Sequence, residues 1–282
     1  KIVRLFGPEH GMAGSAADGI AVADGIDPLT QLPVVSLYGE RLRPSASSLA
    51  DLDAVVFDVQ DIGTRFYSYV WTLQNVLSAC AIAGVPVTVL ARPNPLGGRL
   101  DMAEGPMLDP KFASFVGGDA IPVRHSLTVG ELALLWSAQR WPKAMPPVIA
   151  CSGWRRDMLW SDTELPWVPT SPSMTSFDSA LLYPGICGFE STNMSVGRGT
   201  PSPFQRVGAP WLEPHLVLEY MAAVSLPGVR LEPDRFTPTH ATFAREECAG
   251  VRIHITDPRS VRPVEVGLLL LAAVAATHRT RF

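Results

Sequence analysis

The stretch from Ala54 to Leu90 decides the fold class, and it reads AVVFDVQDIGTRFYSYVWTLQNVLSACAIAGVPVTVL. Two short apolar runs, Ala54 to Val59 and Val85 to Leu90, have the composition of buried strands. Between them, Tyr67 to Ala83 carries apolar residues at helical spacing and ends at Gly84, a residue type that commonly terminates helices. Strand, helix and strand in this order predict a βαβ unit with a parallel sheet and a right-handed crossover.

The pattern continues on both sides of this unit. Ile2 to Phe6 predicts another parallel strand, and Thr128 to Gln139 predicts a helix that begins with a capping box of Thr128 and Glu131. Further elements are expected at 148–150 (strand), 251–255 (half-exposed strand of period two) and 264–276 (buried helix). Proline recurs from Leu165 to Pro172, so a domain boundary is expected near residue 175, which gives an α/β domain over 1–175 and a smaller one over 176–282.

Composition narrows the class of protein. The chain has 23 Lys and Arg against 27 Asp and Glu, a formal net charge of −4, and no block of like charge. A nucleic-acid or anionic-membrane partner is therefore disfavoured, because such partners select basic surfaces. No apolar run reaches the roughly 20 residues of a membrane span. The four cysteines, Cys80, Cys151, Cys187 and Cys248, lack zinc or redox spacing and are expected to be buried thiols.

Polar residues follow each expected strand of the first domain. In open α/β sheets, ligands bind beyond the carboxyl ends of the strands. If the three strands share one sheet, their ends deliver one rim of polar side chains: Glu9, His10, Asp58, Gln60, Asp61, Arg65, Arg92 and Asn94. The sequence therefore predicts a binding site at this rim.

Glu9 is the first catalytic candidate. Pro8 fixes the turn before it and the flanking glycines let the backbone bend, so its carboxyl group is presented rigidly. Glycosidic cleavage commonly needs a carboxylic acid that protonates the leaving oxygen and a second group at the anomeric carbon. Asp58, Asp61 and Glu190 are candidates for the second group. The alternative is that Glu9 only caps a helix starting near His10.

Arginines near the rim suggest an anionic ligand, because the guanidinium fork binds carboxylates bidentately. They are Arg65, Arg92, Arg124 and Arg198. The alternative is that they pair inside the fold with Asp58, Asp61 and Glu190. Signature motifs for dinucleotide binding, phosphate loops, serine hydrolases and zinc proteases are missing, and the six histidines lack paired spacing, so no cofactor and no metal are expected.

Nine motifs together resemble one family over nearly the whole chain, in the same order. They are FGPEHG (6–11), LPVVSLYG (32–39), FDVQDIGTRFYSY (57–69), RPNPLGG (92–98), EGPMLDP (104–110), FVGGDAIPVRHSLTVGELA (115–133), LPWVPTSPSM (165–174), LLYPGICGFESTN (181–193) and GRGTPSPF (197–204). The family is that of the bacterial exo-β-N-acetylmuramidases of the NamZ type.

The resemblance implies a Rossmann-like first domain, a smaller α+β second domain and an active-site cleft between them. It implies release of N-acetylmuramic acid (MurNAc) from the non-reducing ends of peptidoglycan fragments such as MurNAc-GlcNAc, by proteins that are usually exported. Family members commonly begin with a further strand and continue beyond the last helix, so the chain is expected to be truncated at both ends. The family's catalytic glutamate falls on Glu9.

The expected site is therefore as follows. The catalytic candidates are Glu9 and Glu190, and the substrate-binding candidates are His10, Asp58, Gln60, Asp61, Arg65, Arg92, Asn94, Arg124, His125, Asn193 and Arg198. Arg65 or Arg92 is favoured as the partner of the lactyl carboxylate of MurNAc. Two other readings stay open: a non-catalytic cell-wall sugar-binding protein, and a metal-dependent peptidoglycan hydrolase or amidase. The sequence does not predict the oligomeric state.

Overall fold

The computed structural model describes residues 1–282, and the chain forms two compact units. The first unit comprises 1–101, 107–163 and 170–172, and the second comprises 102–106, 164–169 and 173–282. Each unit thus includes a short segment from the other's stretch of sequence. The expected boundary near residue 175 stays a prediction.

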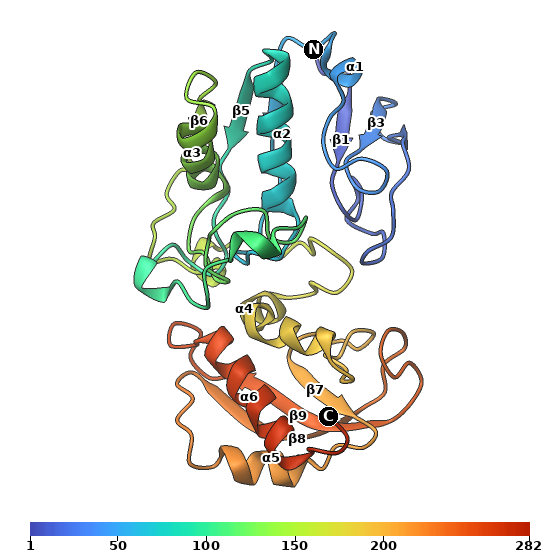
Figure 1. The fold of residues 1–282 in the computed structure, drawn as a ribbon, viewed down its shortest axis with the longest axis vertical. Helices are drawn as coiled ribbons and strands as arrows, with labels where there is room; N and C mark the ends of the chain where they lie inside the picture. The colour runs from blue at the N-terminus through green and yellow to red at the C-terminus, as the bar shows by residue number, and fades with distance from the viewer. The chain divides into compact units, whose positions relative to one another are not determined.

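The first unit contains six strands and three α-helices (Figure 1). Their bounds are β1 Leu5–Gly7, β2 Gly25–Ile26, β3 Pro33–Ser36, α1 Ala46–Leu49, β4 Val55–Phe57, α2 Tyr69–Ala83, β5 Val87–Leu90, α3 Val129–Arg140 and β6 Val148–Ile149. Four 3-10 helices occur in the chain, at Leu100–Met102, Pro110–Phe112, Trp160–Thr163 and Cys187–Ser191.

The βαβ prediction is confirmed. Strands β4, β5 and β6 form a parallel sheet in that order, and α2 connects β4 to β5. Gly84 ends α2 in the left-handed conformation, with φ at 72°. Strand and helix side chains form one buried cluster, which includes Val55, Phe57, Val87, Val89, Leu73, Leu77, Leu132 and Trp136.

The expectation that three strands share one sheet is wrong. β1 pairs in parallel with β3, and β2 pairs antiparallel with β3, so these strands form a separate sheet of order β1-β3-β2. The run 2–6 is also shorter as a strand than expected, because only Leu5–Gly7 finds partners in Val34–Ser36. The pairing partner of β1 is β3, about thirty residues further along the chain. The local sequence pattern of β1 carries no information about which strand it pairs with.

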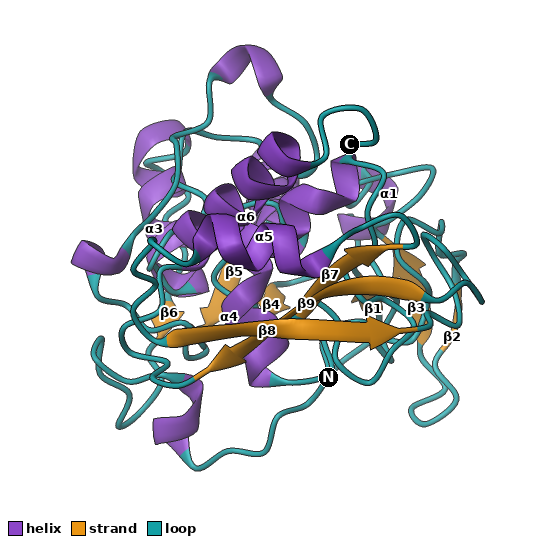
Figure 2. Cartoon of the chain, turned by 90° about the horizontal axis from the view of Figure 1, so that it is seen from below, coloured by secondary structure: helices purple, strands orange, loops and turns teal.

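The second unit is an antiparallel sheet with helices. Strands β7 (Arg206–Ala209), β9 (Cys248–Ile255) and β8 (Val229–Phe236) lie side by side, and α5 (Pro214–Met221) and α6 (Pro263–Thr277) lie on one face (Figure 2). The remaining helix, α4 (Phe177–Ile186), crosses α6. The predicted strand over 251–255 and helix over 264–276 are confirmed, each slightly longer than expected.

The cysteine prediction is correct in part. All four thiols are free, but only Cys80 and Cys248 are buried, while Cys151 and Cys187 are half-buried. None of the helices combines the length and the apolar character needed to cross a bilayer.

Candidate active site

Glu9 lies in a tight turn directly after β1. Gly11 donates a backbone hydrogen bond to the Pro8 carbonyl, and His10 and Gly11 both have positive φ, at 68° and 73°. A non-glycine residue in this conformation is uncommon and is held by its surroundings. No helix starts near His10, because residues 9–14 form turns, so the cap interpretation of Glu9 is wrong.

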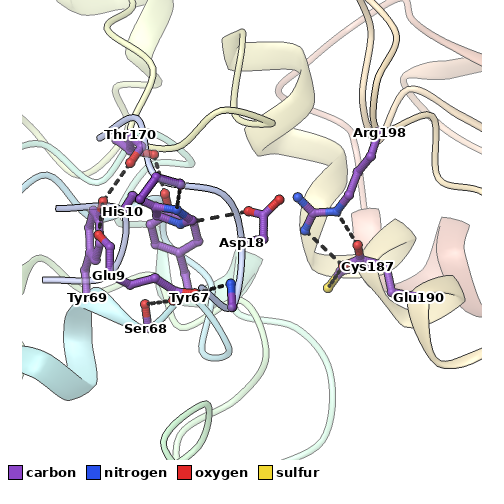
Figure 3. A network of polar contacts seen from close by, with 12 residues as sticks. Glu9, His10, Asp18, Tyr67, Ser68, Tyr69, Thr170, Cys187, Glu190 and Arg198 are labelled. Atoms are coloured by element: carbon purple, nitrogen blue, oxygen red, sulfur yellow. Dashed lines mark hydrogen bonds and ion pairs between the residues drawn. The ribbon is translucent and has the colours of Figure 1, made fainter. Parts of the chain in front are cut away.

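The carboxylate of Glu9 accepts hydrogen bonds on both oxygens (Figure 3). Ser68 Oγ lies 2.5 Å from Oε2, and the backbone nitrogen of Gly19 lies 3.1 Å from Oε1. Ser68 is the residue immediately before α2. Glu9 therefore lies beside the start of a helix after all, but the helix is one that begins 60 positions later in the chain.

Three tyrosines lie in the region of Glu9, and one of them, Tyr38, interacts with its carboxylate. Burial, followed by the charge of Glu9 and a hydrogen bond with it, raises the pKa of Tyr38 to about 12. The hydroxyl of Tyr69 donates to the Thr170 carbonyl at 2.6 Å and lies 3.2 Å from the Glu9 carbonyl, and Tyr67 bonds to the Thr170 hydroxyl at 2.6 Å. Burial raises the pKa of both Tyr67 and Tyr69, so these hydroxyls stay protonated and available as donors.

His10 is buried, with 4% of its surface exposed. Its Nδ1 lies 2.8 Å from the Ala16 carbonyl, and its Nε2 lies 3.9 Å from Asp18. The Ala16 amide in turn donates to the His10 carbonyl. His10 therefore stabilises the loop over residues 11–19, whose last residue, Gly19, donates its amide to Glu9.

A second polar cluster occupies the ends of β4 and β5. The side chains of Asp61 and His125 are 6% and 0% exposed, and His125 Nε2 lies 3.2 Å from Asp61 Oδ2. Because His125 Nδ1 accepts from the Leu127 amide, the ring proton belongs on Nε2, facing Asp61. The same Asp61 oxygen accepts from the Gly63 amide.

Gly63 and Asn94 explain why this rim is so tightly constrained. A Cβ at Gly63 would lie 2.4 Å from Asn94 Oδ1, and φ at Gly63 is 82°, so only glycine fits. Asn94 donates to the Leu127 carbonyl, and Gln60 donates to the Pro93 carbonyl. The structure thus brings together Gln60, Asp61 and Asn94, as the strand-end argument predicts, and adds His125, which that argument did not include.

The arginines of the first unit have different surroundings. Arg92 pairs with Asp58 at 2.7 Å, and both side chains are about two-fifths exposed. Arg65 donates to the Ile121 carbonyl and its pKa is lowered by burial. Arg124 is 1% exposed and donates to the Leu96 carbonyl, so it holds the fold together.

Glu190, Arg198 and Asn193 belong to the second unit. Both oxygens of Glu190 accept from Arg198, and the Cys187 thiol donates to Oε2 at 3.1 Å (Figure 3). Burial, then the charge of Glu190, raises the pKa of Cys187 well above its usual value. Asn193 donates to the Arg281 carbonyl. Pairing within the fold, expected as an alternative, is thus observed for Arg92 with Asp58 and for Arg198 with Glu190.

Sequence reasoning missed three groups that contact or face the Glu9 carboxylate: Ser68, Tyr38 and the Gly19 amide. Ser68 lay inside the helix expected over 67–83, so the pattern did not single it out, whereas the helix in the structure begins one residue after it, at Tyr69. The other two come from loops whose path the sequence does not predict. No group of three or more His, Cys, Asp or Glu side chains is arranged to hold a metal ion.

Fold and site together define a two-unit α/β protein that holds a hydrogen-bonded glutamate rigidly beyond a strand end. The chain belongs to the exo-β-N-acetylmuramidase NamZ family: residues 1–178 match the family's N-terminal domain and residues 181–282 match its C-terminal domain.

Known relatives agree with this assignment. The chain is 40% identical over 274 residues to the peptidoglycan β-N-acetylmuramidase NamZ of Bacillus subtilis (strain 168), covering 97% of this chain and 66% of that protein. Two crystal structures of DUF1343 family proteins from Bacteroides fragilis NCTC 9343 are similar. One has a TM-score of 0.88 at 36% identity, over 99% of this chain and 71% of that one. The other has a TM-score of 0.68 at 33% identity, over 89% and 63%.

Proposed function

We propose that this protein is a glycoside hydrolase that releases MurNAc from the non-reducing ends of peptidoglycan fragments. The observation that carries the proposal is the family membership, joined to the rigid, hydrogen-bonded presentation of Glu9. The B. subtilis relative is named a peptidoglycan β-N-acetylmuramidase, and the chain spans 66% of its length. A site of action outside the cytoplasm is part of the proposal, and cell fractionation would test it.

In the proposed reaction Glu9 is the general acid. Its proton passes to the glycosidic oxygen while the bond from that oxygen to the anomeric carbon breaks, and the electron pair of the bond leaves with the oxygen. Water finally supplies the hydroxyl group at the anomeric carbon, and its other proton returns Glu9 to the acid form, directly or through solvent. Glu9 suits this task because the Pro8 turn and two hydrogen bonds fix its direction.

The second catalytic group is open between a carboxylate, an activated water and the acetamido group of the substrate. Among the carboxylates, Asp61 is the weakest candidate, because its side chain is buried against His125. Asp58 is accessible but paired with Arg92, and Glu190 is held by Arg198 on both oxygens. To act at the anomeric carbon, Asp58 or Glu190 would first have to break its ion pair with arginine.

For the lactyl carboxylate of MurNAc, Arg92 is the better partner. Its guanidinium is about two-fifths exposed, and its ion-pair partner, Asp58, is equally accessible. Arg65 is turned to a backbone carbonyl, and burial already lowers its pKa. Gln60, Asn94, His125, Asn193 and the remaining candidates would then support the sugar site mainly by fixing its loops.

The test is hydrolysis of a chromogenic β-MurNAc glycoside by the wild-type chain and by Glu9→Gln. We expect the substitution to lower the rate at least about 100-fold, because an amide cannot donate the acid proton and general acid catalysis contributes 10²-fold or more. Glu40→Gln, at an exposed glutamate of the same unit, should leave the rate unchanged. A Glu9→Gln protein that keeps more than about a tenth of the rate would contradict the assignment.

An incubation with MurNAc-GlcNAc separates the other two readings. Binding without release of free sugar would identify a non-catalytic sugar-binding protein. Release that a chelator abolishes would identify a metal-dependent hydrolase. Release of MurNAc that a chelator leaves intact supports the proposal.

A further inference from the structure

Ser68 occupies the position before α2 but does not cap it. Serine at this position usually accepts a hydrogen bond from a backbone amide two or three residues later. Here the side chain makes no capping bond, and its backbone is already helical, with φ at −63° and ψ at −17°. The hydroxyl instead points to Glu9 Oε2 at 2.5 Å.

We propose that Ser68 is a positioning residue for catalysis, whose hydroxyl stabilises the negative charge that develops on Glu9 as Glu9 gives up its proton. This inference rests on the proposed function. The distance of 2.5 Å is that of a close hydrogen bond between a hydroxyl and a carboxyl group. Ser68 is 3% exposed, so bulk water does not compete for the bond.

The two oxygens of Glu9 have different partners, and this difference assigns their roles. The Gly19 amide on Oε1 can only donate, so Oε1 serves as the acceptor oxygen in both protonation states. A hydroxyl can both donate and accept, so Ser68 can accept from a proton on Oε2 in the free enzyme. When substrate binds, the glycosidic oxygen replaces Ser68 as the acceptor of that proton, and the Ser68 hydroxyl turns to donate to Oε2 as the proton leaves. Oε2 is therefore the oxygen that carries the catalytic proton.

The start of α2 adds to the effect. Its 15 residues place the positive end of the helix dipole at Ser68, beside the carboxylate. Both contributions grow as Glu9 becomes charged, so they favour the transition state over the bound substrate. Loss of the hydroxyl should consequently lower kcat and leave KM nearly unchanged.

The experiment compares Ser68→Ala, Ser68→Thr and Thr128→Ala in the complete chain with a chromogenic β-MurNAc glycoside. We expect Ser68→Ala to lower kcat roughly 10-fold to 100-fold, with KM changed less than about twofold. Ser68→Thr keeps the hydroxyl and should recover most of kcat. Thr128 is the matched control, because its hydroxyl does cap a helix, α3, and makes no contact with Glu9.

Thr128→Ala should therefore lower the thermal unfolding midpoint and leave kcat unchanged. Ser68→Ala should lower kcat and leave the midpoint unchanged. The inference is overturned if Ser68→Ala retains kcat, if its loss is confined to KM, or if Ser68→Thr is as impaired as Ser68→Ala. The inference is also overturned if Ser68→Ala loses activity only because its thermal unfolding midpoint is lower and the protein is partly unfolded in the assay. If the wild-type chain itself releases no MurNAc, the proposed function fails and this inference falls with it.

Discussion

At the scale of single residues, the pair of Arg92 and Asp58 offers a test of substrate selection. Both side chains are accessible at the end of the β4–β5 sheet. If Arg92 binds the lactyl carboxylate, Arg92→Ala removes a charged hydrogen bond of about 1.5–3 kcal/mol. We therefore expect KM for a MurNAc glycoside to rise roughly 10-fold or more, and KM for the matching GlcNAc glycoside to change little.

Arg99→Ala is the matched control, because Arg99 forms an exposed ion pair with Asp101, as Arg92 does with Asp58. It should change neither constant. If Arg92→Ala raised KM equally for both glycosides, Arg92 would shape the pocket without binding the lactyl carboxylate.

The residue scale also shows where prediction from sequence stops. Glu9 could be predicted as a catalytic candidate because the residues that shape its turn, Pro8 and the flanking glycines, are next to it in the sequence. The ion pair of Arg92 and Asp58 could be expected because β4 and β5 end side by side. The bond from Ser68 to Glu9 joins residues 59 positions apart, one in the turn after β1 and the other directly before α2. Such a contact depends on how β1 is placed, which no local pattern encodes.

At the scale of elements, the crossing of α4 and α6 depends on two glycines. A Cβ at Gly185 would lie 1.8 Å from the Pro263 carbonyl oxygen, and a Cβ at Gly267 would lie 2.4 Å from the backbone of Gly185. Gly267→Ala should therefore lower the free energy of unfolding by about 1–3 kcal/mol, although alanine favours helix by itself.

Gly188→Ala is the control, because its Cβ would meet only Leu271, at an ordinary 3.6 Å. Chemical denaturation of the two variants measures the difference. If Gly267→Ala is as stable as the wild type, the two helices do not approach as closely as described.

Element prediction succeeded where the signal is local and failed where it is not. The capping box of Thr128 and Glu131 and the left-handed Gly84 were readable because a helix end is defined within a few residues. The sheet that contains β1 was not, since its partner β3 has only four residues and no strong strand pattern. Strands of two to four residues are stabilised mainly by the neighbouring strands with which they pair, so their positions cannot be predicted from sequence alone.

At the scale of the whole molecule, buried thiols and phenols dominate the expected response to alkaline pH. Burial raises the pKa of Cys80 and Cys248 to about 11, and burial together with Glu9 raises that of Tyr38 to about 12. In the unfolded chain these groups ionise near their ordinary values of 9.0 and 10.0. Above about pH 9 the unfolded state therefore binds fewer protons than the folded state.

Stability must then fall as pH rises, because the free energy of unfolding decreases wherever the unfolded state holds fewer protons. The stabilisation is fully present below pH 9 and is lost progressively up to the pKa of the folded groups, at most about 1.4 kcal/mol per pH unit for each group. We expect the thermal unfolding midpoint to decline from pH 9 to 11 and to be nearly constant from pH 7 to 8.5. A variant with both Cys80→Ala and Cys248→Ala starts from a lower midpoint but should decline less steeply, since two of the linked protons are gone. A midpoint that stays level up to pH 11, or an equal slope in the variant, would mean that these thiols ionise in the folded protein as readily as in the unfolded chain.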